Sequence, residues 1–266
     1  MPEDFARWCR HSPMSDPGHG AALYDLLPND KAALCRAVQG LLLHADWTSA
    51  YGLPDSHFDA DARTTLPLKE RLARIVDSDP RPLAVARTVR ERAPGTCRDY
   101  ALMLCSILRH RRIPARVRCG FAAYFRNGPW EDHWLCELWQ ASDGRWRRMD
   151  AQLDEVHRKH LGIDFDITDV PADQFITAGE AWRRCRKGAI DDSHFGHGDA
   201  KGLWFVRVNV MRDHYSLNQS ELSPWDSWRQ ATEKHRVVSK DDQRAVDPLA
   251  AEPDAAKVEI APPWLA

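Results

Sequence analysis

Three residues whose types together support thiol chemistry occur along the chain in the order Cys97, His133 and Asp150. A cysteine thiolate attacks acyl carbons, a histidine takes the thiol proton, and a carboxylate holds the imidazole in one tautomer. These groups are the minimum set for forming an acyl-enzyme from an amide or a thioester. Because they are far apart in the sequence, the elements that carry them decide whether they meet.

Cys97 is expected at the first position of a helix. Thr96 and Asp99 have the spacing of a capping box, in which the side chain of each residue bonds the backbone N–H of the other. Apolar residues then recur at helical spacing from Ala101 to Leu108. Unpaired N–H groups and the macrodipole at a helix N-terminus favour an anion, which lowers the pKa of a thiol there. The pattern therefore predicts a reactive thiolate.

The exposure of this sulfur has two interpretations. Pro94 and Gly95 predict a sharp turn before the helix, which would leave the sulfur of Cys97 exposed. Alternatively, Cys97 fills space in the core, as free cysteines commonly do. We give that second interpretation to Cys105, whereas the partners of Cys97 favour catalysis.

His133 and Asp150 are expected on two paired strands. After a first strand over residues 115–125, residues 133–139 and 145–150 alternate in polarity and flank a turn at 141–144. With a four-residue loop, Leu135 lies opposite Asp150, and His133 is the diagonal neighbour of Asp150 at a backbone distance of about 7–8 Å. His133 and Asp150 then share one face of the hairpin.

Other roles for these strand residues remain open. A histidine beside a carboxylate is often a surface residue or part of a structural hydrogen bond. Glu137 and Asp132 are competing orienters of the ring. In the same register, however, Glu137 faces Arg148, which predicts a cross-strand ion pair, so we choose Asp150.

The remaining chain predicts further elements around this segment. We expect a single domain over residues 1–236 with a catalytic core at about 85–154, and a loosely ordered tail at 237–266, which is rich in Ala, Pro and Asp. Hydrophobic periodicity predicts helices over residues 30–44, 67–78 and 82–92, and β-branched and aromatic content predicts a strand over 202–210.

Three segments, GTCRDYALMLCSILRHRRIPARVRCGF, DHWLCELW and GRWRRMDAQLD, resemble the core of the transglutaminase-like superfamily. The resemblance implies an α+β fold with a papain/transglutaminase-like core. In that core the cysteine-bearing helix packs on an antiparallel sheet, here with extra helices and C-terminal elaborations. It also implies that Cys97, His133 and Asp150 are the catalytic residues. Flanking phrases such as VQGLLLHADWTSAYG and GLWFVRVNV resemble a bacterial branch of the superfamily.

The resemblance implies cysteine-dependent amide or thioester chemistry. We expect hydrolysis, as in an amidase, peptidase or deamidase. Two alternatives stay open: a biosynthetic acyltransferase that forms amides from a carrier-bound acyl group, and a non-catalytic binding protein that retains the fold. The chain lacks the multidomain layout and calcium loop of the animal crosslinkers, which argues against protein crosslinking.

An acyl-transfer site also needs hydrogen-bond donors for the oxyanion. The backbone N–H of Cys97 is the first candidate. The resemblance implies an upstream side chain as the second, for which Gln39, Trp47 and Tyr51 are candidates, although ordinary packing explains each of them as well. Trp130 is a candidate wall of the substrate cleft.

Composition excludes several classes of partner. The net charge of −2 disfavours nucleic acid, and we interpret the basic run from Arg109 to Arg118 as a solvated helix end. Seven scattered cysteines, with no apolar leader or membrane-length segment, predict a reduced, cytoplasmic protein. His194 and His197 in a glycine-rich loop are poor evidence for metal. We therefore expect no cofactor, no metal and no membrane contact. The expected partners are a small-molecule amide or peptide substrate and, for the acyltransferase alternative, a carrier protein.

Overall fold

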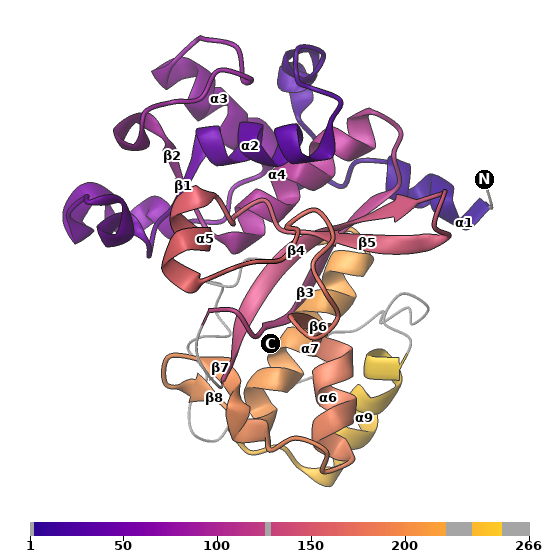
Figure 1. Ribbon diagram of the computed structural model, residues 1–266. Coiled ribbons are helices and arrows are strands. Elements are labelled where there is room, and N and C mark those ends of the chain that lie inside the picture. The colour runs from indigo at the N-terminus through magenta and orange to yellow at the C-terminus, as the bar shows by residue number, and fades with distance from the viewer. Residues whose placement is uncertain (1–2, 126–128, 222–235, 252–266) are drawn as a thin grey trace. The chain divides into compact units, whose positions relative to one another are not determined.

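The computed structural model describes residues 3–125, 129–221 and 236–251 (Figure 1). The chain forms two compact units: unit 1 comprises residues 1–117 and 135–171, and unit 2 comprises residues 118–134 and 172–266. Strands β3 (Ala115–Ala122) and β4 (Trp130–Gln140) continue from one unit into the other. The expectation of a single domain over residues 1–236 stays a prediction.

Unit 1 contains the helix that carries Cys97. Its α-helices are α1 (Glu3–Ala6), α2 (Lys31–Leu41), α3 (Leu68–Ser78), α4 (Cys97–His110) and α5 (Glu155–Leu161). The predicted helices at 30–44 and 67–78 form as α2 and α3, but residues 42–44 belong to strand β1 (Leu42–His44) and not to α2. The side chain of Asp30 caps α2 by accepting from the backbone N–H of Ala33. The prediction of a helix at 82–92 is wrong, because only one 3₁₀ turn (Val89–Glu91) forms there.

Short 3₁₀ segments connect many of these elements. In addition to η6 (Val89–Glu91), they are η1 (Arg7–Cys9), η2 (Gly18–Tyr24), η3 (Thr48–Tyr51), η4 (Asp55–His57), η5 (Ala60–Arg63) and η7 (Asp192–His194).

A small parallel sheet in unit 1 leads into α4. Strand β1 (Leu42–His44) pairs with β2 (Ala93–Gly95). Pro94 and Gly95 therefore lie in a strand rather than in the predicted sharp turn, because their backbone is held by this pairing. Cys97 is correspondingly buried, with 9% of its surface exposed, and not exposed as expected.

The larger sheet has the strand order β6-β3-β4-β7-β8, with β5 (Arg145–Met149) paired to β4. The β4–β5 pair is antiparallel and matches Glu137 with Arg148 and Gln140 with Arg145, so its loop holds residues 141–144 as predicted. Cys105 of α4 is a hydrogen-bonding neighbour of Cys136 of β4 in unit 1. The cysteine-bearing helix thus packs on the β4–β5 hairpin.

Unit 2 contains the other strand pairs. In unit 2, β3 pairs antiparallel with β6 (Phe175–Thr177), β4 pairs parallel with β7 (Phe195–His197), and β7 pairs antiparallel with β8 (Ala200–Lys201). Taken with the helices, the mostly antiparallel pairing confirms the predicted α+β class.

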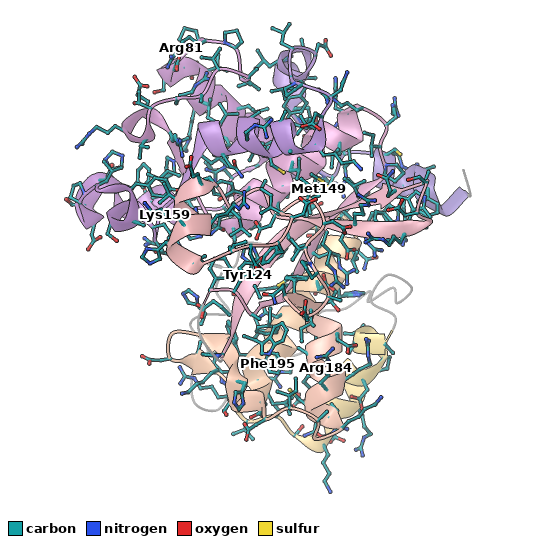
Figure 2. All side chains as sticks on the ribbon, viewed as in Figure 1. Arg81, Tyr124, Met149, Lys159, Arg184 and Phe195 are labelled. Carbon is teal, nitrogen blue, oxygen red and sulfur yellow. The ribbon has the colours of Figure 1, made fainter. Side chains whose placement is uncertain are left out.

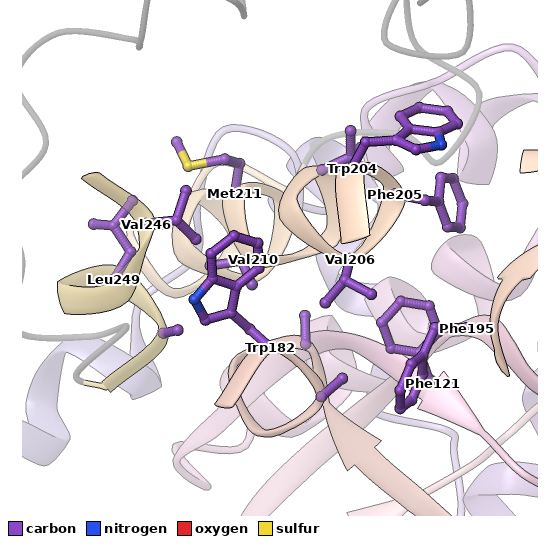
Figure 3. Packing of buried hydrophobic residues seen from close by; sticks show 14 of the residues in the cluster. Phe121, Trp182, Phe195, Trp204, Phe205, Val206, Val210, Met211, Val246 and Leu249 are labelled. Atoms are coloured by element: carbon purple, nitrogen blue, oxygen red, sulfur yellow. The ribbon is translucent and has the colours of Figure 1, made fainter. Parts of the chain in front are cut away.

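The core of unit 2 lies among α6 (Ala178–Arg186), α7 (Leu203–Leu217) and α9 (Lys240–Ala251), which pack against one another (Figure 3). Phe121 of β3 contacts Phe195 of β7, with ring centroids 5.0 Å apart. The indole N–H of Trp182 donates to Asp247 of α9 over 2.7 Å.

One prediction for this part of the chain is wrong. Residues 203–217 form helix α7 rather than a strand at 202–210, because a segment that is buried on all sides fits a helix as well as a strand. Residues 240–251 form α9 within the expected loose tail, because Val246, Leu249 and Ala250 bury one helical face. The rest of that tail, residues 252–266, lies outside the described residues.

Candidate active site

The N-terminal turn of α4 holds Cys97 in a capping box, as the sequence predicts. The backbone N–H of Thr96 donates to Oδ2 of Asp99 over 2.8 Å, and the Thr96 side chain in turn accepts from the backbone N–H of Asp99. Cys97 is the first residue of the helix. The thiol therefore lies where N–H groups without intrahelical partners favour a negative charge.

Asp99 also anchors this turn through two buried ion pairs. Its carboxylate lies 3.0 Å from Arg71 of α3 and 3.0 Å from Arg98. Burial opposes ionisation of Asp99, but the two guanidinium groups and the Thr96 N–H outweigh burial and lower its pKa. Sequence reasoning found the cap and missed Arg71, whose side chain also donates to the carbonyl of Pro94 in β2.

His133 lies in the unit 2 part of β4, and aromatic rings surround its imidazole. Ring centroids of Tyr124 (labelled in Figure 2), Phe125 and Phe175 lie 5.8, 4.8 and 6.5 Å from it, all with steep interplanar angles. Only 1% of His133 is exposed. Sequence reasoning missed these three residues. The adjacent pair Tyr124 and Phe125, at the end of the expected strand, was the available signal.

Asp150 follows β5 directly and is buried in unit 1. Its backbone N–H donates to the carbonyl of Ile167 over 2.9 Å, and its Oδ1 accepts from the backbone N–H of Gln152 over 3.0 Å. The hairpin register matches Cys136 with Met149, and one further pair places Leu135 opposite Asp150, as the loop length predicts.

Cys97 and Asp150 belong to unit 1 and His133 belongs to unit 2. Their assembly into one site therefore stays a prediction. Each residue does lie on its expected element. Cys97 is at a helix start, His133 is on a strand, and Asp150 is at the end of the neighbouring strand.

The two competing carboxylates have cationic partners. Glu137 lies 3.5 Å from Arg148 across the hairpin, which confirms the predicted pair, and 2.8 Å from Arg116. In unit 2, Asp132 lies 3.4 Å from Arg212 of α7. Both carboxylates thus have structural roles.

The candidate oxyanion donors and the candidate residue of the substrate cleft wall have different contacts. Trp47 stacks on His157 with a centroid distance of 4.4 Å, and Trp130 packs against Phe195 in unit 2 at 6.2 Å. Gln39 lies on α2, is 8% exposed, and has no hydrogen-bond partner for its Nε2 among the described residues. A buried amide donor without a partner is costly, so Gln39 stays a candidate for the second oxyanion donor.

Tyr51 is already engaged in a polar network that the sequence did not reveal. Its hydroxyl donates to Oδ2 of Asp154 over 2.7 Å, and Nδ1 of His157 lies 3.0 Å from Oδ1 of the same carboxylate. Burial opposes ionisation of Asp154, but the hydrogen bonds from His157 and Tyr51 lower its pKa to about 2. Gln152 lies 3.5 Å from His157, so the network reaches the turn that begins at Asp150.

The basic run is not the solvated helix end that we expected. Arg109 is 1% exposed and donates to the carbonyl of Ala115 and to Ser15. Arg111 donates to the carbonyls of Pro28 and Leu27. These two guanidinium groups bond carbonyl and hydroxyl oxygens in unit 1, which accounts for both of them without a polyanion.

The described residues contain no group of three or more His, Cys, Asp or Glu side chains that could hold a metal ion. In unit 2, Nδ1 of His197 instead lies 2.5 Å from Oε1 of Glu131. Over the same residues, every helix is too short or too polar to cross a bilayer.

Residues 68–151 match the model of the transglutaminase-like superfamily. This segment is similar to a transglutaminase-like core. It runs from α3 to the residue after Asp150 and includes Cys97 and His133. The transglutaminase-like core therefore contains all three predicted catalytic residues.

One solved structure is similar to the chain over a wider range. It is the crystal structure of a candidate cysteine protease from Cytophaga hutchinsonii, with a TM-score of 0.39 and 15% sequence identity. The similarity covers 66% of this chain and 46% of that one, so this chain spans less than half of that protein. None of the curated proteins compared with the sequence matches it.

Proposed function

We propose that the protein is a cysteine-dependent enzyme that takes an acyl group from an amide or a thioester onto Cys97 and releases it to water. The observation that carries the proposal is the position of Cys97, at the capped N-terminus of α4 inside the transglutaminase-like core. There the helix supplies both a stabilised thiolate and, through the N–H of Cys97, a first oxyanion donor.

In the proposed reaction His133 removes the proton from Cys97, and the sulfur adds to the carbonyl carbon. Collapse of the tetrahedral adduct breaks the bond to the leaving amine or thiol, which takes the proton from His133. Water, deprotonated by His133, then breaks the thioester and yields a carboxylic acid. Asp150 holds the imidazole, and Gln39 is the proposed second donor to the oxyanion.

The activation of Cys97 can be tested without knowing the substrate. Iodoacetamide labelling near pH 6, resolved by peptide mass spectrometry, should modify Cys97 at least about tenfold faster than a model thiol, because only the thiolate reacts. Cys136 is the internal reference, since burial raises the pKa of its thiol. Labelling of Cys97 no faster than the model thiol would overturn the proposal.

The base is tested by His133→Gln, with His160→Gln as a matched control at an exposed histidine of unit 1. The first change should slow labelling of Cys97, and the second should not. An equal rate in both variants would remove His133 as the base. Asp150→Asn should also slow labelling, because an amide orients the imidazole and stabilises the imidazolium less well than a carboxylate does.

Transfer to an amine is the alternative for the second step, since the acyl-enzyme is the same. Trapping the acyl-enzyme and offering amines separates the two outcomes. Hydrolysis predicts that the free acid dominates at millimolar amine, whereas a biosynthetic acyltransferase predicts that the amide dominates.

A further inference from the structure

The imidazole of His133 lies against an aromatic wall, defined as Tyr124, Phe125 and Phe175. The nearest ring, Phe125, has its centroid 4.8 Å from the imidazole at an interplanar angle of 61°. Phe175 is fully buried and Tyr124 is 8% exposed, whereas Phe125 is half-buried. Phe125 is therefore the member of the wall that a molecule from solvent can touch.

The acidic residues next to His133 on β4 do not offset this apolar character. Glu131 lies 2.5 Å from His197, and Asp132 lies 3.4 Å from Arg212. Asp132 thus has a cation of unit 2 beside it, and Glu131 is in contact with a histidine. A cationic group that approached His133 would meet aromatic rings and carboxylates that already have partners in unit 2.

The position of the wall has a consequence for the leaving group. In the proposed reaction the imidazole gives its proton to the leaving atom and later takes a proton from the attacking one. Groups that surround the imidazole therefore lie next to the leaving group of the substrate and next to the nucleophile that later replaces it. Resting on the proposed function, we propose that Phe125 and its wall select an apolar amine on that side, aromatic or long aliphatic, over a cationic one.

Amine capture of an acyl-enzyme tests this selection, because an attacking amine occupies the same place as a leaving amine. 4-Nitrophenyl acetate acetylates the thiolate: a C–S bond forms, the ester C–O bond breaks, and 4-nitrophenolate leaves. Phenethylamine or 1,4-diaminobutane then attacks the thioester, its proton passes to His133, and the Cys97 thiolate is regenerated with release of the acetamide. Water in place of the amine gives acetate.

The measurement is the ratio of acetamide to acetate for each amine, at equal concentrations of free base. The ratio should be about tenfold higher for phenethylamine than for 1,4-diaminobutane, because one well-placed aromatic contact changes a rate by about this factor. Phe125→Ala should reduce that preference severalfold. Phe58→Ala is the matched control, because Phe58 is also half-buried and lies 4.6 Å from a histidine, His57, in unit 1.

The outcomes separate the two proposals. A 4-nitrophenolate burst that persists unchanged in Cys97→Ala would overturn the proposed function. A burst that depends on Cys97, with equal capture of both amines by the wild-type protein, would overturn the selection alone. If Phe125→Ala does not fold, Phe125→Leu replaces it, and an unchanged preference in that variant would assign the selection to other residues and refute the role of Phe125.

Discussion

Asp99→Ala should destabilise unit 1 by more than the loss of a helix cap. The Asp99 carboxylate is 4% exposed and pairs with Arg71 and Arg98, whose side chains are 5% and 1% exposed. Losing a cap costs about 1 kcal/mol. Removing one partner of a buried ion pair costs about 3–5 kcal/mol, because the remaining charge stays buried without compensation. We expect the free energy of unfolding to fall by about 4 kcal/mol, which is close to the cost of breaking a buried ion pair.

Urea unfolding followed by circular dichroism measures this loss, and amide exchange in residues 97–110 assigns it to α4. The double variant Asp99→Leu with Arg71→Leu should recover part of it, because it removes a buried charge together with its partner. Glu91 gives a matched control: it forms the same capping box with Thr88, but 51% of its side chain is exposed. Glu91→Ala should therefore cost far less.

The same carboxylate predicts how stability depends on pH. Because the pKa of Asp99 is lowered in the folded protein, the unfolded chain binds its proton more readily. The stabilisation is therefore complete above the unfolded pKa of about 3.9 and is lost as pH falls through the folded pKa. Asp99→Asn should make the free energy of unfolding depend less on pH in this acid range.

A loss below about 1 kcal/mol in Asp99→Ala would refute the argument from a buried ion pair, because the loss of a helix cap alone explains that much.

Two further predictions test contacts that the sequence did not reveal. Tyr51→Phe removes the hydroxyl that donates to Asp154, so it should cost about 1 kcal/mol at pH 7. It should also raise the pKa of Asp154 from about 2, so that the acid loss of stability due to this carboxylate is smaller and ends at higher pH; acid titrations of both proteins check this, and coincident curves would contradict it. Leu249→Ala should cost about 2–4 kcal/mol, measured by urea unfolding, because α9 buries Leu249. No change would support the loose tail expected from composition.

The parts of the candidate site that the sequence predicts are those set by neighbours in the chain. The capping box joins Thr96 to Asp99 over one helical turn, and the hairpin register follows from four loop residues and alternation along two strands. Such features depend on local geometry, which residue type and spacing determine directly. For this reason the helix start at Cys97 and the pairing of Glu137 with Arg148 were both correct.

The features that the sequence missed depend on partners far away in the chain. Arg71 lies one helix earlier than Asp99, and Arg109 bonds Ser15 near the N-terminus. Hydrophobic periodicity cannot show which loop carbonyl a guanidinium meets. Helix α7 was missed for a related reason: burial on every face removes the polar stripe that distinguishes a helix from a strand.

These long-range partners also bear on which carboxylate can assist His133. A residue that orients the base must stabilise the imidazolium that forms when the thiol loses its proton. Glu137 lies between Arg116 and Arg148, and Asp132 faces Arg212, so neighbouring cations already compensate the charge of each carboxylate. Oδ1 of Asp150 accepts from the backbone N–H of Gln152, which fixes the position of that carboxylate. Because the contacts of Glu137 and Asp132 are structural, Asp150 stays the proposed orienter.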